Sequence, residues 1–288
     1  MGKKRLFIIL FSCLLFAPTT RGQKPLIIGP SQGLYQLGPH LSYYIDKSAN
    51  LTFQEVLPKK FTPLGKKTNF GFSDSAYWLK IVISNPKNED LFFTIRTPFF
   101  DFIEFHKKEN THWETIRTGD KRPFFSRRLN SRFFPFKIRP GPSSTYLIKI
   151  KTTSFIPINM TLEKTDDFLK NSTFENIIFG FFFGLIATLF FSNILVFFFT
   201  KKRTYILYTA YLFSYGILNV FTSGLGFQFI YPNIIWLQQF GALIFTAFAG
   251  ISGVSFLKSY LNIEDKGPYD KIIKIYIFLW PIPFLLLF

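Results

Sequence analysis

A long uncharged run, Ile177–Thr200, constrains this chain more than any other feature. An α-helix of that length rises roughly 36 Å, which is enough to cross the ~30 Å hydrocarbon core of a membrane. Lys201, Lys202 and Arg203 follow at once, and basic residues beside a span are retained in the cytoplasm. The sequence therefore predicts that everything before Ile177 lies outside the cytoplasm.

Composition divides the 288 residues into two parts. Polar and apolar residues alternate through 23–176, whereas 177–288 is almost continuously apolar. A hydrophobic content of 48% fits a protein that lies partly in a membrane. We therefore predict an outward-facing domain followed by an α-helical transmembrane bundle.

The formal net charge of +17 at pH 7 raises the question of a nucleic-acid partner. The cations are divided between the amino terminus, the end of the first span, a later loop (Lys258, Lys266, Lys271, Lys274) and scattered positions among acids. No basic helix or aromatic RNA-binding motif accompanies them. We therefore expect no nucleic acid among the partners and expect the lipid bilayer instead, with attraction to anionic envelope material as an open alternative.

The amino terminus, residues 1–22, is typical of a secretory signal peptide. Lys3-Lys4-Arg5 forms its charged head, and Leu6–Ala17 forms an apolar core that is too short to span stably. We predict cleavage near Gly22, with an uncleaved anchor as the alternative. Cys13, the only cysteine, lies in this core, so the cleaved chain would have neither disulfides nor thiol chemistry. An outward domain of this kind suits a bacterial periplasm.

Residues 23–165 carry the period-two alternation of β-strands, with turn residues between the runs. About eight short strands at regular spacing predict an all-β periplasmic domain, a β-sandwich of the jelly-roll type. Residues 166–176 are predicted to be a short polar linker. The clearest strands are Tyr77–Ser84, Leu91–Thr97, Phe102–Lys107, Thr111–Arg117, Phe133–Arg139, Thr145–Lys151 and Ile156–Glu163.

The membrane part is predicted to contain about four spans, at 177–200, 205–221, 235–257 and 272–288. The loop between the second and third spans has no Lys or Arg, whereas Lys258–Lys274 is rich in lysine. This asymmetry gives the same orientation as the first span. The apolar part of the last span rises roughly 21 Å, which is too short to cross. We therefore expect an incomplete fourth span and a truncated chain; the alternative is an earlier helix start with Lys274 snorkelling.

Residues for catalysis or metal binding are not evident in the sequence. His40, His106 and His112 fit no metal spacing, and no hydrolase, nucleotide-binding or zinc-protease motif occurs. The predicted spans have no charged residue in their interiors, as ion and proton carriers normally require. We therefore expect no enzyme activity, no cofactor, and neither catalytic, cofactor-binding nor metal-binding residues.

Four residues of the outer domain are candidates for ligand binding. Trp78 and Trp113 are suited to stacking on sugars, although such rings more often fill a sandwich core. Arg127 and Arg128 are suited to pairing with an anionic ligand, although a solvated loop is the commoner arrangement. In the first span, Gly180 and Gly184 are spaced to seat another helix.

Several strings resemble the extracellular sensor domain of bacterial seven-transmembrane receptors with diverse intracellular signalling modules (7TMR-DISM). The outer domain carries Leu37–Leu41, Asn69–Lys80 and Thr118–Asp120. The membrane part is similar at Tyr205–Tyr208 and Leu225–Phe229. The resemblance extends from about Leu37 to the end of the sequence.

This resemblance implies a periplasmic jelly roll of carbohydrate-binding type, then seven spans, then a cytoplasmic output module such as a diguanylate cyclase, histidine kinase, nucleotide cyclase or phosphatase. The present sequence departs from that plan, because it has about four predicted spans and no output module. It therefore implies the sensor and partial membrane portion of a signal-transduction receptor in the bacterial inner membrane, a multi-pass protein with its N-terminal domain in the periplasm.

The sequence identifies neither the ligand nor the oligomeric state. The expected partner is an unknown periplasmic ligand, with carbohydrate as one candidate, and unpaired helix faces make a homo-oligomer a candidate assembly. One alternative is a membrane-anchored carbohydrate-binding or envelope-associated module without signalling. A transporter subunit or membrane enzyme is the other, and the charge-free spans disfavour it.

Overall fold

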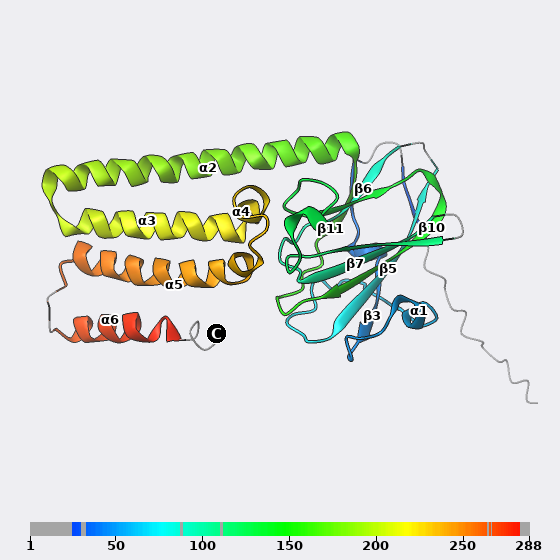
Figure 1. Ribbon diagram of the computed structural model, residues 1–288, viewed down its shortest axis with the longest axis horizontal. Coiled ribbons are helices and arrows are strands. Elements are labelled where there is room, and N and C mark those ends of the chain that lie inside the picture. The colour runs from blue at the N-terminus through cyan, green and yellow to red at the C-terminus, as the bar shows by residue number, and fades with distance from the viewer. Residues whose placement is uncertain are drawn as a thin grey trace, which may run out of the picture.

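The computed structural model describes residues 25–29, 33–86, 89–109, 112–263, 265 and 267–282. The predicted signal peptide and the last six residues of the predicted fourth span lie outside these ranges. Figure 1 shows a β-sheet domain at one end of the molecule and a set of roughly parallel helices at the other. One long helix, α2 (Thr165–Thr200), begins beside the sheets and runs along the whole helical part.

The β-domain consists of two mostly antiparallel sheets. The larger follows the order β4-β3-β5-β10-β7-β8, with β1 paired to β5 in parallel. The smaller follows the order β2-β11-β6-β9. The larger sheet contains β1 (Leu26–Ile27), β3 (Ser42–Asp46), β4 (Thr62–Pro63), β5 (Ala76–Asn85), β7 (Phe102–Glu109), β8 (His112–Thr118) and β10 (Gly141–Lys151), and the smaller contains β2 (Leu34–Gln36), β6 (Leu91–Ile95), β9 (Phe134–Ile138) and β11 (Met160–Lys164).

The core lies between the two sheets and follows the alternation seen in the sequence. One face of β5, β9 and β10 is buried in a single apolar cluster that also takes residues from β6 and β11. Phe105 of the larger sheet stacks on Phe136 of the smaller, with ring centroids 4.2 Å apart. The predicted sandwich is therefore confirmed as two facing sheets. The inward residues are Tyr77, Leu79, Ile81, Ile83, Phe134, Phe136, Ile138, Tyr146, Ile148 and Ile150.

The predicted strand at Ile156–Glu163 is wrong in its first half, because β11 begins only at Met160. The preceding backbone bonds to a different segment: Phe70 N donates to Ile156 O at 2.9 Å, and Ile158 N donates to Thr68 O at 2.8 Å. A period-two pattern does not reveal which strand a segment pairs with, so two consecutive extended segments were read as one.

The predicted linker, residues 166–176, forms the first turns of α2. Asp166 and Asp167 lie in the first turn, where negative charge favours the amino-terminal end of a helix. The segment contains neither Pro nor Gly, and Phe168 is buried against Phe92 at a centroid distance of 4.9 Å. The sandwich is therefore joined to the predicted first span by rigid helix rather than by an irregular connection.

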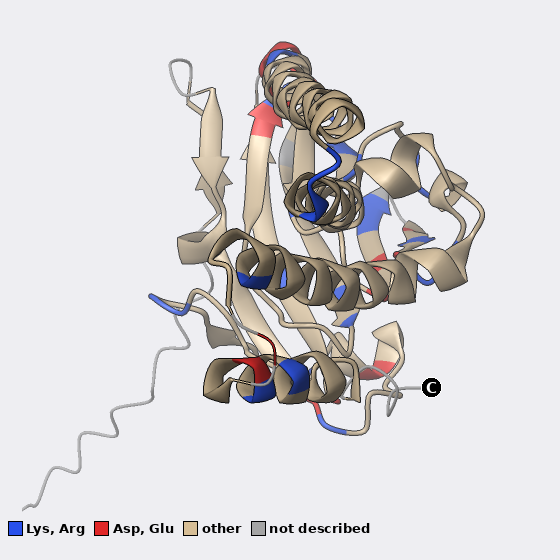
Figure 2. Cartoon of the chain, turned by 90° about the vertical axis from the view of Figure 1, so that its left-hand side faces the viewer, with Lys and Arg blue, Asp and Glu red and all other residues tan. Residues whose placement is uncertain are grey.

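The remaining helices are α3 (Arg203–Thr222), α4 (Leu225–Phe229), α5 (Ile235–Tyr260) and α6 (Pro268–Leu279). In the described part of the chain, α2 and α5 are long and apolar enough to cross a membrane. Figure 2 looks at the helical part from the end remote from the sandwich, and blue marks Lys and Arg near the helix ends. Asp270 of α6 pairs with Lys258 of α5 and, within its own helix, with Lys274.

Helix contacts differ from the one that the Gly180 and Gly184 spacing predicts. A side chain added at either position would meet open space, so that pair contacts no helix in the described part of the chain. Close approaches occur elsewhere: Gly216 of α3 lies against Ile186 of α2, and Gly241 of α5 lies against Phe221 of α3. The bundle therefore uses small residues of α3 and α5 rather than those of α2.

Candidate functional site: the interface between sandwich and helices

The two candidate tryptophans lie together on the outer face of the larger sheet. A short helix, α1 (Phe53–Val56), covers this face, and Trp78 is 0% exposed beneath it. Trp113 is partly buried, with its ring 4.7 Å from that of Phe53. The structure therefore brings these rings together as a second small core, in which Trp78 offers no surface to a ligand.

Arg127 belongs to a different part of the structure, the loop 119–133, which packs against the helices. Its side chain is buried, and Nη1 donates to the carbonyls of Ser131 at 3.1 Å and Arg132 at 2.5 Å. The guanidinium lies over the rings of Phe134 and Phe227, at 4.2 and 5.6 Å from their centroids. Since Phe227 belongs to α4, Arg127 holds this loop and joins the sandwich to the helical part.

Arg128 is exposed and pairs with Glu114 of β8. Glu114 also accepts from Lys107 at 2.9 Å, and these two cations hold the pKa of its carboxyl below the usual value. The structure does not bring Arg127 and Arg128 into one ligand site, because the first faces the helices and the second faces the edge of the larger sheet.

Replacing Arg128 with alanine is expected to lower the free energy of unfolding by less than about 1 kcal/mol, because exposed ion pairs contribute little. Thermal unfolding of the full chain in lipid nanodiscs measures the change. Arg117→Ala is the matched control, since Arg117 is similarly exposed and pairs with Glu104 at 3.2 Å. A loss well above that of the control would show that Arg128 has a further role.

A group that sequence reasoning missed joins the smaller sheet to α2. Glu175 of α2 accepts from Arg96 at 2.7 Å and from Arg132 at 2.6 Å. Arg96, which follows β6, also donates to Glu163 of β11 at 3.1 Å. These four residues, here called the arginine–glutamate cluster, connect two strands, one loop and the long helix.

Neighbouring side chains fix the geometry of this cluster. Glu163 is fully buried and accepts from Thr161 Oγ1 at 2.8 Å and from Asn171 Nδ2 of α2 at 2.9 Å. Arg132 lies over the ring of Phe179, also in α2, at 4.6 Å from its centroid. Buried charges with this many partners are strongly held in place, so α2 is attached to the sandwich over several turns.

The loop 119–133 also packs directly on the helices. Phe124 N donates to Pro232 O at 2.9 Å, and the Phe124 ring meets the edge of Phe227 at 5.6 Å. Gln228 Nε2 of α4 donates to Asn130 O at 3.0 Å. The sandwich therefore contacts both α2 and the segment that connects α3 to α5.

Asp120 lies at the centre of this contact. It is buried, its Oδ1 atom has no hydrogen-bond partner among the described residues, and Gln239 at the start of α5 lies near enough to lower the pKa of its carboxyl group. Burial raises the pKa of Asp120 to about 6, and the neighbouring Asp101 adds to the rise, while Gln239, Arg127 and Lys121 oppose it. This carboxyl is thus a titratable group between the sensor-like domain and a helix that is apolar enough to span a membrane.

Sequence signals for these residues are weak but not absent. Glu175 is the last acid before the uncharged run that opens the membrane part, and Arg96 directly follows a buried strand. Neither position has a motif around it. Their roles depend on which strand neighbours which, and periodicity alone does not give that order.

Comparison with known families completes the description of the chain. Residues 38–164 match the family model described as 7TMR-DISM extracellular 2. Residues 175–288 match the model described as 7TM diverse intracellular signalling. No curated protein matches the sequence. The boundary between the two matched regions, 165–174, coincides with the first turns of α2.

Proposed function

Because the chain belongs to the 7TMR-DISM family of membrane signalling receptors, with an extracellular sensor domain, we propose that its sandwich binds a ligand and biases the membrane helices through α2. One observation carries the proposal. Helix α2 is unbroken from the arginine–glutamate cluster at Glu175 into the long apolar segment that ends at Thr200. A rigid helix transmits a displacement that an irregular linker would absorb.

The mechanism needs two arrangements of the sandwich relative to the helices. A ligand shifts the balance between them only by binding one arrangement more tightly than the other. The contacts that would differ are those of Glu175 with Arg96 and Arg132, and the hydrogen bond from Phe124 N to Pro232 O, which lies just before α5. A change at the sandwich would then reach both α2 and α5.

Several finer properties belong to the same proposal. The sandwich is of jelly-roll type, the helical part supplies four spans with the last incomplete, and the protein lies in a bacterial inner membrane with the sandwich in the periplasm. The cations of Lys201–Arg203 and Lys258 support this orientation, because both groups lie at helix ends remote from the sandwich. The chain itself acts as a sensor rather than an enzyme.

The orientation can be tested with reporter fusions in a bacterial host. Alkaline phosphatase is active only outside the cytoplasm, and green fluorescent protein exported in unfolded form does not fluoresce there. We expect phosphatase activity after Gly224 and fluorescence after Arg203. The reverse pattern would place the sandwich in the cytoplasm and exclude an extracellular sensor.

Carbohydrate remains a proposed ligand class, and a homo-oligomer a proposed assembly. An envelope-associated module without signalling is the second candidate function. In that case the sandwich and the helices would respond independently, whereas a receptor requires that a change at one alters hydrogen exchange at the other. Hydrogen exchange of the α4 amides, compared between the wild-type chain and a variant altered in the arginine–glutamate cluster, distinguishes the receptor from the envelope-associated module.

A further inference from the structure

A pocket of about 490 Å³ opens beside the start of α2, at the end of the sandwich remote from α3 and α4. Strand β9 begins beside Arg132, which reaches Ser223 after α3, and runs away from α3 and α4, so Arg139 lies about 20 Å further out. The pocket is formed by the ends of β7 and β9 and the start of β10, and its lining residues are Lys107, Lys108, Lys137, Arg139, Pro140, Gly141, Ser143, Ser144, Thr145 and Tyr146.

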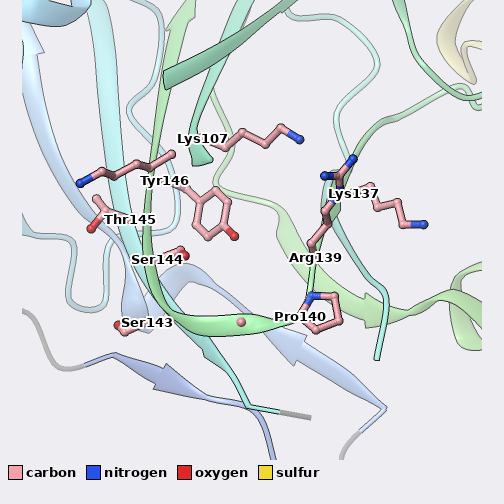
Figure 3. A pocket seen from close by; sticks show the side chains of 10 residues that line it. Lys107, Lys137, Arg139, Pro140, Ser143, Ser144, Thr145 and Tyr146 are labelled. Carbon is pink, nitrogen blue, oxygen red and sulfur yellow. The ribbon is translucent and has the colours of Figure 1, made fainter. Parts of the chain in front are cut away.

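The charges of this lining are all of one sign. Among the residues that the structure describes, it contains three lysines and one arginine and no carboxylate. Figure 3 shows the amino group of Lys107 and the hydroxyl groups of Ser144 and Tyr146 directed toward the side of the pocket where Arg139 stands. Lys107 is nearly buried and keeps its orientation through its 2.9 Å ion pair with Glu114. Cations and hydroxyl donors around one space bind oxyanions.

Other ligand classes suit this pocket less well. A metal ion requires carboxylate, imidazole or thiolate ligands, and none lines it. A neutral sugar is usually bound by an exposed aromatic face together with amides or carboxylates, and Tyr146 is a buried ring. The tryptophans first considered for sugar binding lie under α1 rather than here.

Lys137 connects the pocket to the start of α2. Its amino group lies 2.6 Å from Asp90 Oδ2. The carbonyl of Asp90 accepts from Thr165 N at 3.3 Å and from Thr165 Oγ1 at 3.2 Å. Thr165 is the first residue of α2, the helix that continues into the membrane part. A change at Asp90 therefore acts on the end of this helix that lies beside the sandwich.

We propose that this pocket binds a small oxyanion-bearing ligand, with a carboxylate, sulfate or phosphate group, and that the ligand competes with Asp90 for Lys137. The inference rests on the proposed function, for which it supplies the class of ligand and the place of binding. Withdrawal of Lys137 from Asp90 weakens a contact at the start of α2, so binding changes the attachment of the helix as a receptor requires.

The test is titration calorimetry on the full chain in neutral-lipid nanodiscs, with inorganic phosphate, sulfate and glucuronate as anionic probes and glucose as the neutral one. We expect saturable binding of at least one anion and none of glucose, and we expect the affinity to fall as salt rises. Arg139→Gln should weaken anion binding about 10-fold or more. Lys60→Gln, an exposed lysine outside the pocket, is the matched control and should bind as the wild type does.

A second variant predicts a change of opposite sign. Asp90→Asn removes the carboxylate that holds Lys137, so the anion should bind several-fold more tightly. Absence of saturable anion binding, or an unchanged affinity in Arg139→Gln, would overturn the pocket assignment. Neither result would affect the reporter-fusion test of the receptor, and glucose binding that is insensitive to Arg139→Gln would favour a sugar receptor with its site elsewhere.

Discussion

Replacing Glu175 with alanine is expected to lower the free energy of unfolding by about 2–3 kcal/mol and to detach α2 from the smaller sheet. The variant leaves Arg132, whose side chain is 12% exposed, without its carboxylate partner, and Arg96 keeps only Glu163. Removing one member of a buried ion pair costs more than the pair itself contributes, because the remaining charge stays desolvated. The partial exposure of Glu175, 28%, places the effect below that of a fully buried group.

Two measurements check this expectation on the full chain in nanodiscs. Thermal unfolding gives the loss of stability, and hydrogen exchange of the amides in β6, the loop 129–133 and α4 gives the loss of coupling. Glu175→Gln keeps the shape and one acceptor, and its stability should fall between those of the wild type and the alanine variant.

Asp166→Ala is the control, because Asp166 is an exposed acid in the first turn of the same helix. This change should lower the free energy of unfolding by about 0.5 kcal/mol through the helix dipole and leave hydrogen exchange in α4 unchanged. Equal exchange in Glu175→Ala and Asp166→Ala would contradict the proposed route through α2.

Two sequence patterns predicted the main elements of this fold: the alternation of polar and apolar residues in the strands, and the length of the uncharged run in the first span. The inward residues alternate from Tyr77 to Ile83 in β5 and from Tyr146 to Ile150 in β10, so the sequence alone identified the face of each strand that lies between the sheets. The uncharged run to Thr200, ended by three cations, likewise predicted the end of α2. These features are local, and local patterns survive whatever the rest of the chain does.

The features that sequence patterns did not reveal depend on distant parts of the chain. Trp78 alternates away from the core between the sheets, and α1 packs over it from more than twenty residues upstream, so period two alone does not show what covers it. The polar segment 166–176 gives no local sign of its contacts with the sandwich. The partners of its Phe168 and Glu175 are Phe92 of β6 and Arg96, which follows β6. Arg127 looked like a free loop cation for the same reason, since Phe227 lies about a hundred residues away.

The contact between sandwich and helices is expected to weaken as pH rises from about 4 to about 6. Burial and the neighbouring Asp101 raise the pKa of Asp120 from its ordinary value of 3.8 to about 6. The folded protein therefore holds this proton more tightly than the unfolded chain does. Its stabilising contribution is complete below pH 4 and is lost as pH rises through 6, by roughly 3 kcal/mol in all.

Asp120→Asn should remove most of this pH dependence, because an amide keeps the shape of the protonated acid and does not titrate. Thermal unfolding of the full chain between pH 4 and 7 measures the slope for both proteins. Asp46→Asn is a control of opposite sign: although burial raises the pKa of Asp46, hydrogen bonds from Ser48 and Leu51 outweigh it and lower that pKa, so its stabilising contribution is lost as pH falls. If the slope between pH 4 and 6 is the same in Asp120→Asn as in the wild type, the carboxyl is not the group that titrates. A slope that disappears, together with faster hydrogen exchange at the start of α5 in the wild type above pH 6, would show that ionisation of the buried Asp120 loosens the contact between the sandwich and α5.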